Sequence, residues 1–219
     1  KTLTLFFAQY QQNVTKQKTY SLDLVRFVHF LYGFVAFYIG SMVFFSPAEW
    51  SVYIFGSAPN PNDSDSLLCQ TAGLIYMVLG VYSLTACVCF DWIYFGVTVP
   101  PKVVTAAFYT YHIYTNELPY DPFGYLVITE ITIAFVTWVS LPSVWPHCTL
   151  RSDYVTAAQL THAAVNGVFA LLMSFAPNAV LAFVLPPGSG AGGERWAVVM
   201  GNAEFFMTWV YTASALGSF

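Results

Sequence analysis

Long stretches of apolar residues with almost no charge recur along the chain and limit what it can fold into. The six stretches are Leu24–Phe45, Leu67–Phe90, Pro101–Leu118, Phe123–Leu141, Tyr154–Phe175 and Trp196–Phe219. A membrane-spanning helix needs about 20 predominantly apolar residues. Only 8% of the 219 residues are charged, whereas soluble domains carry roughly 25%. The sequence therefore predicts an all-α polytopic membrane protein with about six transmembrane helices.

The segment between the first two stretches carries the start and stop signals of a short helix. Ser46 suits the N-cap, Pro47 suits the first helical position, and Glu49 is placed to complete a capping box. Gly56 can end the helix in a left-handed conformation. We expect a short amphipathic helix that lies on the membrane surface.

A weaker copy of this segment, Ala176–Gly188, follows the fifth stretch. Both copies close a long apolar stretch with an aromatic residue and a Pro that starts a helix. Either an internal duplication or the convergence of two membrane hairpins explains the likeness. The chain is accordingly divided into a polar N-terminal tail (1–22), a four-helix unit (23–150) and a two-helix unit (151–219), which a duplication would make a partial repeat.

Small residues repeat every seven positions in the second stretch, at Gly73, Gly80 and Cys87. Residues at this spacing fall on one face of a helix. Small residues at such a face let two helix backbones come close together in a membrane. We therefore expect another helix to pack tightly against this face.

Basic residues are distributed unequally between the two sides of the six-span topology. One side carries Lys1, Lys16, Lys18, Arg26, Lys102 and Arg151, and the other carries Arg195. Cytoplasmic loops are rich in Lys and Arg. The N-terminus is therefore predicted to face the matrix, stroma or cytosol.

Ionisable residues within the apolar stretches are the first candidates for function, because a charge at mid-bilayer costs roughly 2.5–3.5 kcal/mol. His112, Glu130 and Glu204 are predicted to lie at similar depth and to form a polar intramembrane layer. The layer is either a proton relay or ligand site, or a buried polar pair that only fixes helix packing. A channel needs polar residues through the full thickness, so a single layer favours the packing interpretation.

His29 and His162 lie early in the first and fifth stretches, at equal depth near the basic side. Two such residues on facing helices would hold a haem, or each would bind a chlorophyll magnesium; alternatively, each is an interfacial hydrogen-bonding group. No zinc spacing, phosphate loop or nucleophile motif is present, so no metal site and no catalytic residue are predicted. Bound phospholipid is the expected ligand, and the lack of a basic run argues against nucleic acid as a partner.

In overall character the chain is similar to lineage-specific supernumerary membrane subunits of respiratory or ATP synthase complexes in unicellular eukaryotes. The shared features are a high aromatic content of 19%, small soluble parts and no catalytic motif. The resemblance implies a non-catalytic accessory subunit that binds lipids and other membrane subunits in the mitochondrial inner membrane. A photosystem accessory subunit that binds pigment in the thylakoid is one alternative. A small transporter or quinone/redox protein is another, because the four-span unit with its polar layer also resembles DoxX-like families.

Overall fold

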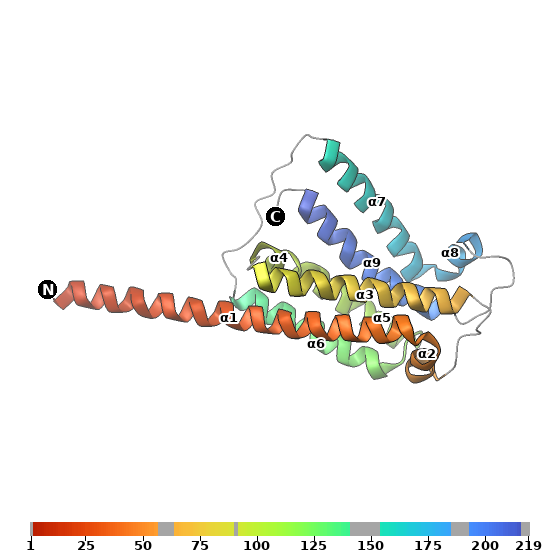
Figure 1. The fold of residues 1–219 in the computed structure, drawn as a ribbon, viewed down its shortest axis with the longest axis horizontal. Helices are drawn as coiled ribbons and strands as arrows, with labels where there is room; N and C mark the ends of the chain where they lie inside the picture. Colours follow the sequence, from red (N-terminus) through yellow and green to blue (C-terminus); the bar gives the residue numbers. More distant parts are fainter. Residues whose placement is uncertain (1, 57–63, 90–91, 141–153, 185–192, 216–219) are drawn as a thin grey trace.

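The computed structural model describes the backbone of residues 2–56, 64–89, 92–140, 154–184 and 193–215, and each element in these ranges is a helix (Figure 1). The helices are α1 (Thr2–Phe45), α2 (Pro47–Phe55), α3 (Ser64–Cys89), α4 (Trp92–Val97), α5 (Val99–Tyr114), α6 (Tyr120–Ser140), α7 (Tyr154–Phe175), α8 (Pro177–Val184) and α9 (Gly193–Ala215). The all-α prediction is confirmed for this part of the chain. Residues 2–22 belong to α1 and are continuous with its apolar half, rather than forming a separate tail.

Four helices in the described ranges are long and apolar enough to cross a membrane, which is compatible with an integral membrane protein. They are Leu22–Phe45 of α1, Ser66–Cys89 of α3, Tyr120–Ser140 (α6) and Thr156–Phe175 of α7. The expected count of about six spans is not supported. α5 has only 16 residues, and α9 includes Glu194, Arg195 and Glu204 among its 23 residues.

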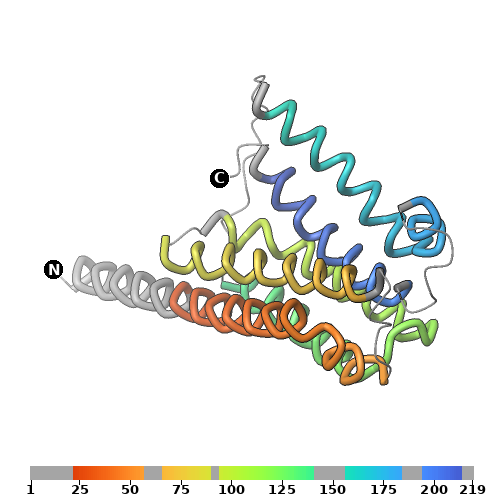
Figure 2. Tube along the Cα trace, turned by 45° about the vertical axis from the view of Figure 1, so that its right-hand side comes forward, coloured from red at the N-terminus to blue at the C-terminus, as the bar shows by residue number. Residues whose placement is uncertain are grey.

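The other two expected spans correspond to α5 and α9, which pack against other helices of the bundle. α9 contacts α3, α5, α7 and α8, and α5 packs against α6 and α9. Figures 1 and 2 show α9 between α3 and α7, with α2 and α8 at one end of the bundle and α4 at the other. Neighbouring helices cover most of α9 and one face of α5, so these covered surfaces need not be apolar.

Small residues bring α1 and α3 into direct backbone contact, as the seven-residue repeat predicts. A Cβ atom added to Gly73 would lie 2.6 Å from the Phe44 nitrogen and 2.7 Å from the Gly40 oxygen. A Cβ atom on Gly80 would lie 2.7 Å from the Gly33 oxygen. No side chain larger than hydrogen fits at these positions unless the two helices separate.

The short helix α2 has most, but not all, of the predicted capping features. Pro47 occupies the first turn, and Gly56 ends the helix with a left-handed φ of 72° while its N–H bonds to Val52 O. The capping box is absent, because Ser46 makes no side-chain cap hydrogen bond. The Ser46 N–H, which Glu49 was expected to bind, already donates to Met42 O at 2.9 Å and so continues α1.

The α1–α2–α3 and α7–α8–α9 segments make similar contacts. Each has a long helix, a short helix that begins at Pro, and a second long helix. A Cβ atom on Gly201 would lie 2.7 Å from Ala170 O and 2.9 Å from Ser174 N, as one on Gly73 would approach the corresponding atoms of α1. Internal duplication stays a prediction, and the predicted unit boundary between residues 150 and 151 lies outside the described residues.

Candidate functional site: a buried polar path through the helix bundle

One face of α5 and of the residue before it is polar and buried along its length. Thr98, Lys102, Thr105, Tyr109 and His112 are spaced at three or four residues and therefore share this face. Each is at most 6% exposed. Buried polar side chains need partners, so the groups that meet this face define the candidate site.

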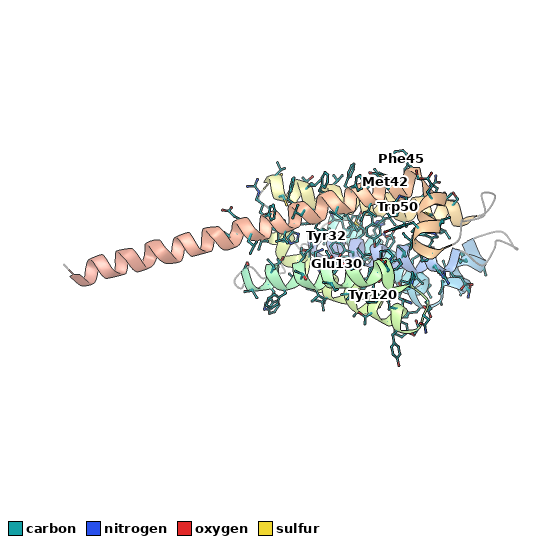
Figure 3. All side chains as sticks on the ribbon, turned by 90° about the horizontal axis from the view of Figure 1, so that it is seen from below. Tyr32, Met42, Phe45, Trp50, Tyr120 and Glu130 are labelled. Carbon is teal, nitrogen blue, oxygen red and sulfur yellow. The ribbon has the colours of Figure 1, made fainter. Side chains whose placement is uncertain are left out.

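Lys102 forms an ion pair with Glu130 of α6 at the centre of the site. The Nζ–Oε2 distance is 2.9 Å, and the two side chains are 1% and 6% exposed. The Lys102 ammonium lies 3.4 Å from the centroid of the Tyr32 ring on α1, and the Tyr32 hydroxyl donates a hydrogen bond to Glu130. Figure 3 shows Tyr32 and Glu130 close together between α1 and α6. Each charge thus has a direct counter-charge and aromatic or hydroxyl neighbours in place of water.

The ion pair lies near the middle of two candidate membrane-spanning helices, since Tyr32 and Glu130 are central in Leu22–Phe45 and Tyr120–Ser140. Lys102 is therefore not a surface cation and does not contribute to the expected charge asymmetry. The cause is α4, because Thr98 N–H bonds to Tyr94 O and Lys102 N–H bonds to Thr98 O. These bonds continue the helical path from α4 into α5.

Two of the aromatic residues of α4 are buried in the bundle. Tyr94 is 5% exposed and Phe95 is 0% exposed. The Tyr94 hydroxyl is 3.1 Å from Ser83 Oγ on α3, and burial raises the pKa of the Tyr94 phenol despite this hydrogen bond. α4 is therefore part of the buried core at one end of the bundle.

Further polar pairs lie on either side of the ion pair. Towards α4, His29 Nε2 shares a hydrogen bond of 3.0 Å with Thr137 Oγ1, and the imidazole packs against Phe95. Towards α2, the hydroxyls of Tyr76 and Tyr109 bond to each other. His29 is fully buried in this cluster, so it is neither an interfacial residue nor paired with His162.

His112 and Glu130 were expected to meet, but the structure gives each a different partner. His112 Nδ1 is 2.5 Å from Glu117 Oε2, at the turn between α5 and α6. Lys102 and His112 are ten residues apart, which corresponds to about 15 Å along a helix. Glu130 pairs with Lys102, so His112 lies at a different level of the bundle.

The polar groups therefore form a path rather than one layer. From His112 to the level of Thr137 the path extends about 25 Å at 1.5 Å per residue, close to the ~30 Å thickness of a bilayer core. One buried oxygen on this face, Thr105 Oγ1, has no hydrogen-bond partner among the described residues. Buried orphan oxygens of this kind are sites where an internal water binds.

Glu204 and His162, which were assigned to different sites, lie near each other away from this path. His162 is exposed on α7, where Asn166 Nδ2 is 3.2 Å from its Nε2 and the Tyr211 ring is 5.0 Å from its own ring. Glu204 on α9 interacts electrostatically with His162. In the described part of the chain, no group of three His, Cys, Asp or Glu residues is placed to hold a metal ion.

Sequence reasoning missed Lys102, Tyr32, Tyr76 and Glu117 as members of the site. The regular spacing of polar residues on α5 was visible in the sequence and would have identified Lys102. Tyr32 and Tyr76 carried no comparable signal, because their roles depend on how distant helices align.

The chain matches no protein-family model, and neither the curated proteins nor the solved structures include a significant match to it. The function of the polar path is therefore inferred from the geometry of the path alone.

Proposed function

We propose that this is a small integral membrane protein that carries protons through the interior of its helix bundle. The observation that carries the proposal is the Lys102–Glu130 ion pair, which is buried at mid-membrane and bonded to Tyr32. Charged residues at this depth are costly, and they commonly belong to ion or proton pathways. A small transporter was one of the alternative functions that the sequence indicated, and this proposal corresponds to it.

The surroundings of the ion pair support proton transfer more than packing alone. Glu130 also interacts electrostatically with Tyr76 and Tyr109, whose hydroxyls bond to each other. Hydroxyl, carboxyl, amine and imidazole groups thus follow one another through the bundle. A pair that only fixed helix packing would need none of the polar groups at other levels.

The test is proton flux into liposomes that contain the purified protein. A potassium diffusion potential drives protons inward, and an encapsulated pH-sensitive dye reports them. We expect flux above that of protein-free liposomes, loss of this flux in Glu130→Gln, and a reduced flux in Tyr32→Phe. Glu49→Gln on α2 is the control, because Glu49 is exposed and is not one of the polar groups of the path.

Size-exclusion chromatography establishes that each variant is folded before reconstitution. Tyr32→Phe keeps the ring and removes only the hydroxyl, so it tests the path even if Glu130→Gln fails to fold. Wild-type flux equal to that of empty liposomes would refute the proposal. Full flux in a folded Glu130→Gln variant would refute it equally.

A second candidate is the accessory subunit of a large energy-transducing complex, in the mitochondrial inner membrane or, second, the thylakoid. His162 favours it, because this imidazole is exposed within the span Thr156–Phe175 and exposure of a polar group to lipid is unfavourable. A neighbouring subunit that covered His162 would remove this cost. Co-migration with a large complex in mild detergent would support this role, and isolation as a free monomer from native membranes would contradict it.

A further inference from the structure

The end of α5 places an acidic side chain directly over a buried histidine. Asn116 has a left-handed φ of 62°, its N–H bonds to Ile113 O, and the Glu117 N–H bonds to His112 O at 2.9 Å. These two bonds define a Schellman motif, in which the second residue after the helix end contacts the third residue from that end. Here the usual hydrophobic contact is replaced by the Glu117–His112 pair.

The two partners differ in their access to water. The Glu117 side chain is 51% exposed, whereas that of His112 is 1% exposed. His112 Nδ1 faces Glu117, and its buried Nε2 has no hydrogen-bond partner among the described residues. The imidazole therefore connects an accessible carboxylate with the interior, where Tyr109 lies one turn earlier on the same face of α5.

Glu117 also lines a pocket of about 360 Å³ at this end of the bundle, between α2, the α5–α6 turn and α9. Asn116, Tyr120 and Arg195 provide its other polar walls, and Ile54 and Phe55 of α2 provide apolar ones. The Arg195 guanidinium lies 5.5 Å from the Phe55 ring. This volume is large enough for several water molecules beside the Glu117 carboxylate.

We infer that this pocket is the mouth of the proton path and that Glu117 and His112 are its entry relay. The inference rests on the proposed function. The Glu117 carboxylate takes a proton from water in the pocket and passes it to His112 Nδ1. The imidazolium then releases its Nε2 proton towards Tyr109, which leaves a neutral imidazole with its proton on Nδ1 beside the ionised Glu117 carboxylate, so the pair has the same net charge as before.

The relay is tested by comparing entry and central variants in the same liposome assay. Glu117→Gln keeps the shape and removes the titratable group, and we expect it to lose most of the flux. His112→Asn should lose most of it too, whereas Glu117→Asp should restore part. Glu49→Gln is the control, because it removes an exposed carboxylate that does not line this pocket, and we expect its flux to be unchanged.

The outcomes separate the relay from the function it serves. If wild-type flux depends on Glu130 but survives in folded Glu117→Gln and His112→Asn variants, the relay is wrong and the proton path stands. If the wild-type protein carries no protons, the entry relay and the proposed function are both wrong. Loss of flux in Glu49→Gln equal to that in Glu117→Gln would also overturn the relay, because the effect would then belong to the loss of any surface carboxylate rather than to the pair.

Discussion

Replacing Lys102 with Met would leave the Glu130 carboxylate inside the bundle without its counter-charge. The ion-pair distance is 2.9 Å and the side chains are 1% and 6% exposed, so water cannot take the place of the missing partner. Loss of one partner of a buried pair costs about 3–5 kcal/mol of unfolding free energy. Glu130→Met should cost a similar amount, plus about 1 kcal/mol for the lost Tyr32 hydrogen bond.

The double variant should be much more stable than the sum of the single variants predicts. Apolar replacement of both charges removes the desolvation cost together with the attraction, and such replacements are often neutral. We therefore expect a coupling free energy of at least about 2 kcal/mol, within the range for residues in direct contact.

The measurement is unfolding by SDS titration in mixed micelles, followed by tryptophan fluorescence, with all four proteins compared under one condition. Glu49→Met is the control, because Glu49 is exposed and its change should stay within about 0.5 kcal/mol. Additive effects of Lys102→Met and Glu130→Met would refute the reasoning, because they would mean that the two charges do not interact in the folded protein.

Two further predictions concern helix packing. Gly73→Ala should destabilise the protein by about 1–3 kcal/mol, because the new methyl group would lie 2.6 Å from a backbone nitrogen of α1. Gly167→Ala is its control in the same unfolding assay, because that methyl would approach only the end of a side chain, at 3.2 Å. Ser51→Ala should cost about 1–3 kcal/mol by removing the acceptor of the buried Trp196 Nε1–H, now 2.8 Å from Ser51 Oγ. Unchanged tryptophan fluorescence and stability in Ser51→Ala would contradict this.

The helices could be located from the sequence, because hydrophobic stretches, Pro starts and Gly ends are local signals. Gly73 and Gly80 also predicted a close helix contact correctly, since their spacing is a property of one helix. The sequence did not show which helix would pack against this face of α3. The choice of helix depends on which distant glycines align with Gly73 and Gly80, and α1 supplies these.

The membrane-span count and the polar pairings failed for a common reason. Hydropathy treats each helix as if lipid surrounded it, whereas other helices cover most of α9 and the polar face of α5. Lys102 is at the start of the apolar stretch Pro101–Leu118 and was therefore assigned to the basic side of the membrane. Only the continuation from α4 moves it to the interior, and this continuation depends on backbone hydrogen bonds that composition does not reveal.

The position of α9 has a consequence for the order in which the protein is assembled. α9 is the last described helix to leave the ribosome, yet it contacts α3, α5 and α7. Its charged residues make it a poor substrate for insertion on its own. We therefore expect α9 to enter the bilayer together with α7, its principal neighbour, and the packing of α3 and α5 to be completed only after that step.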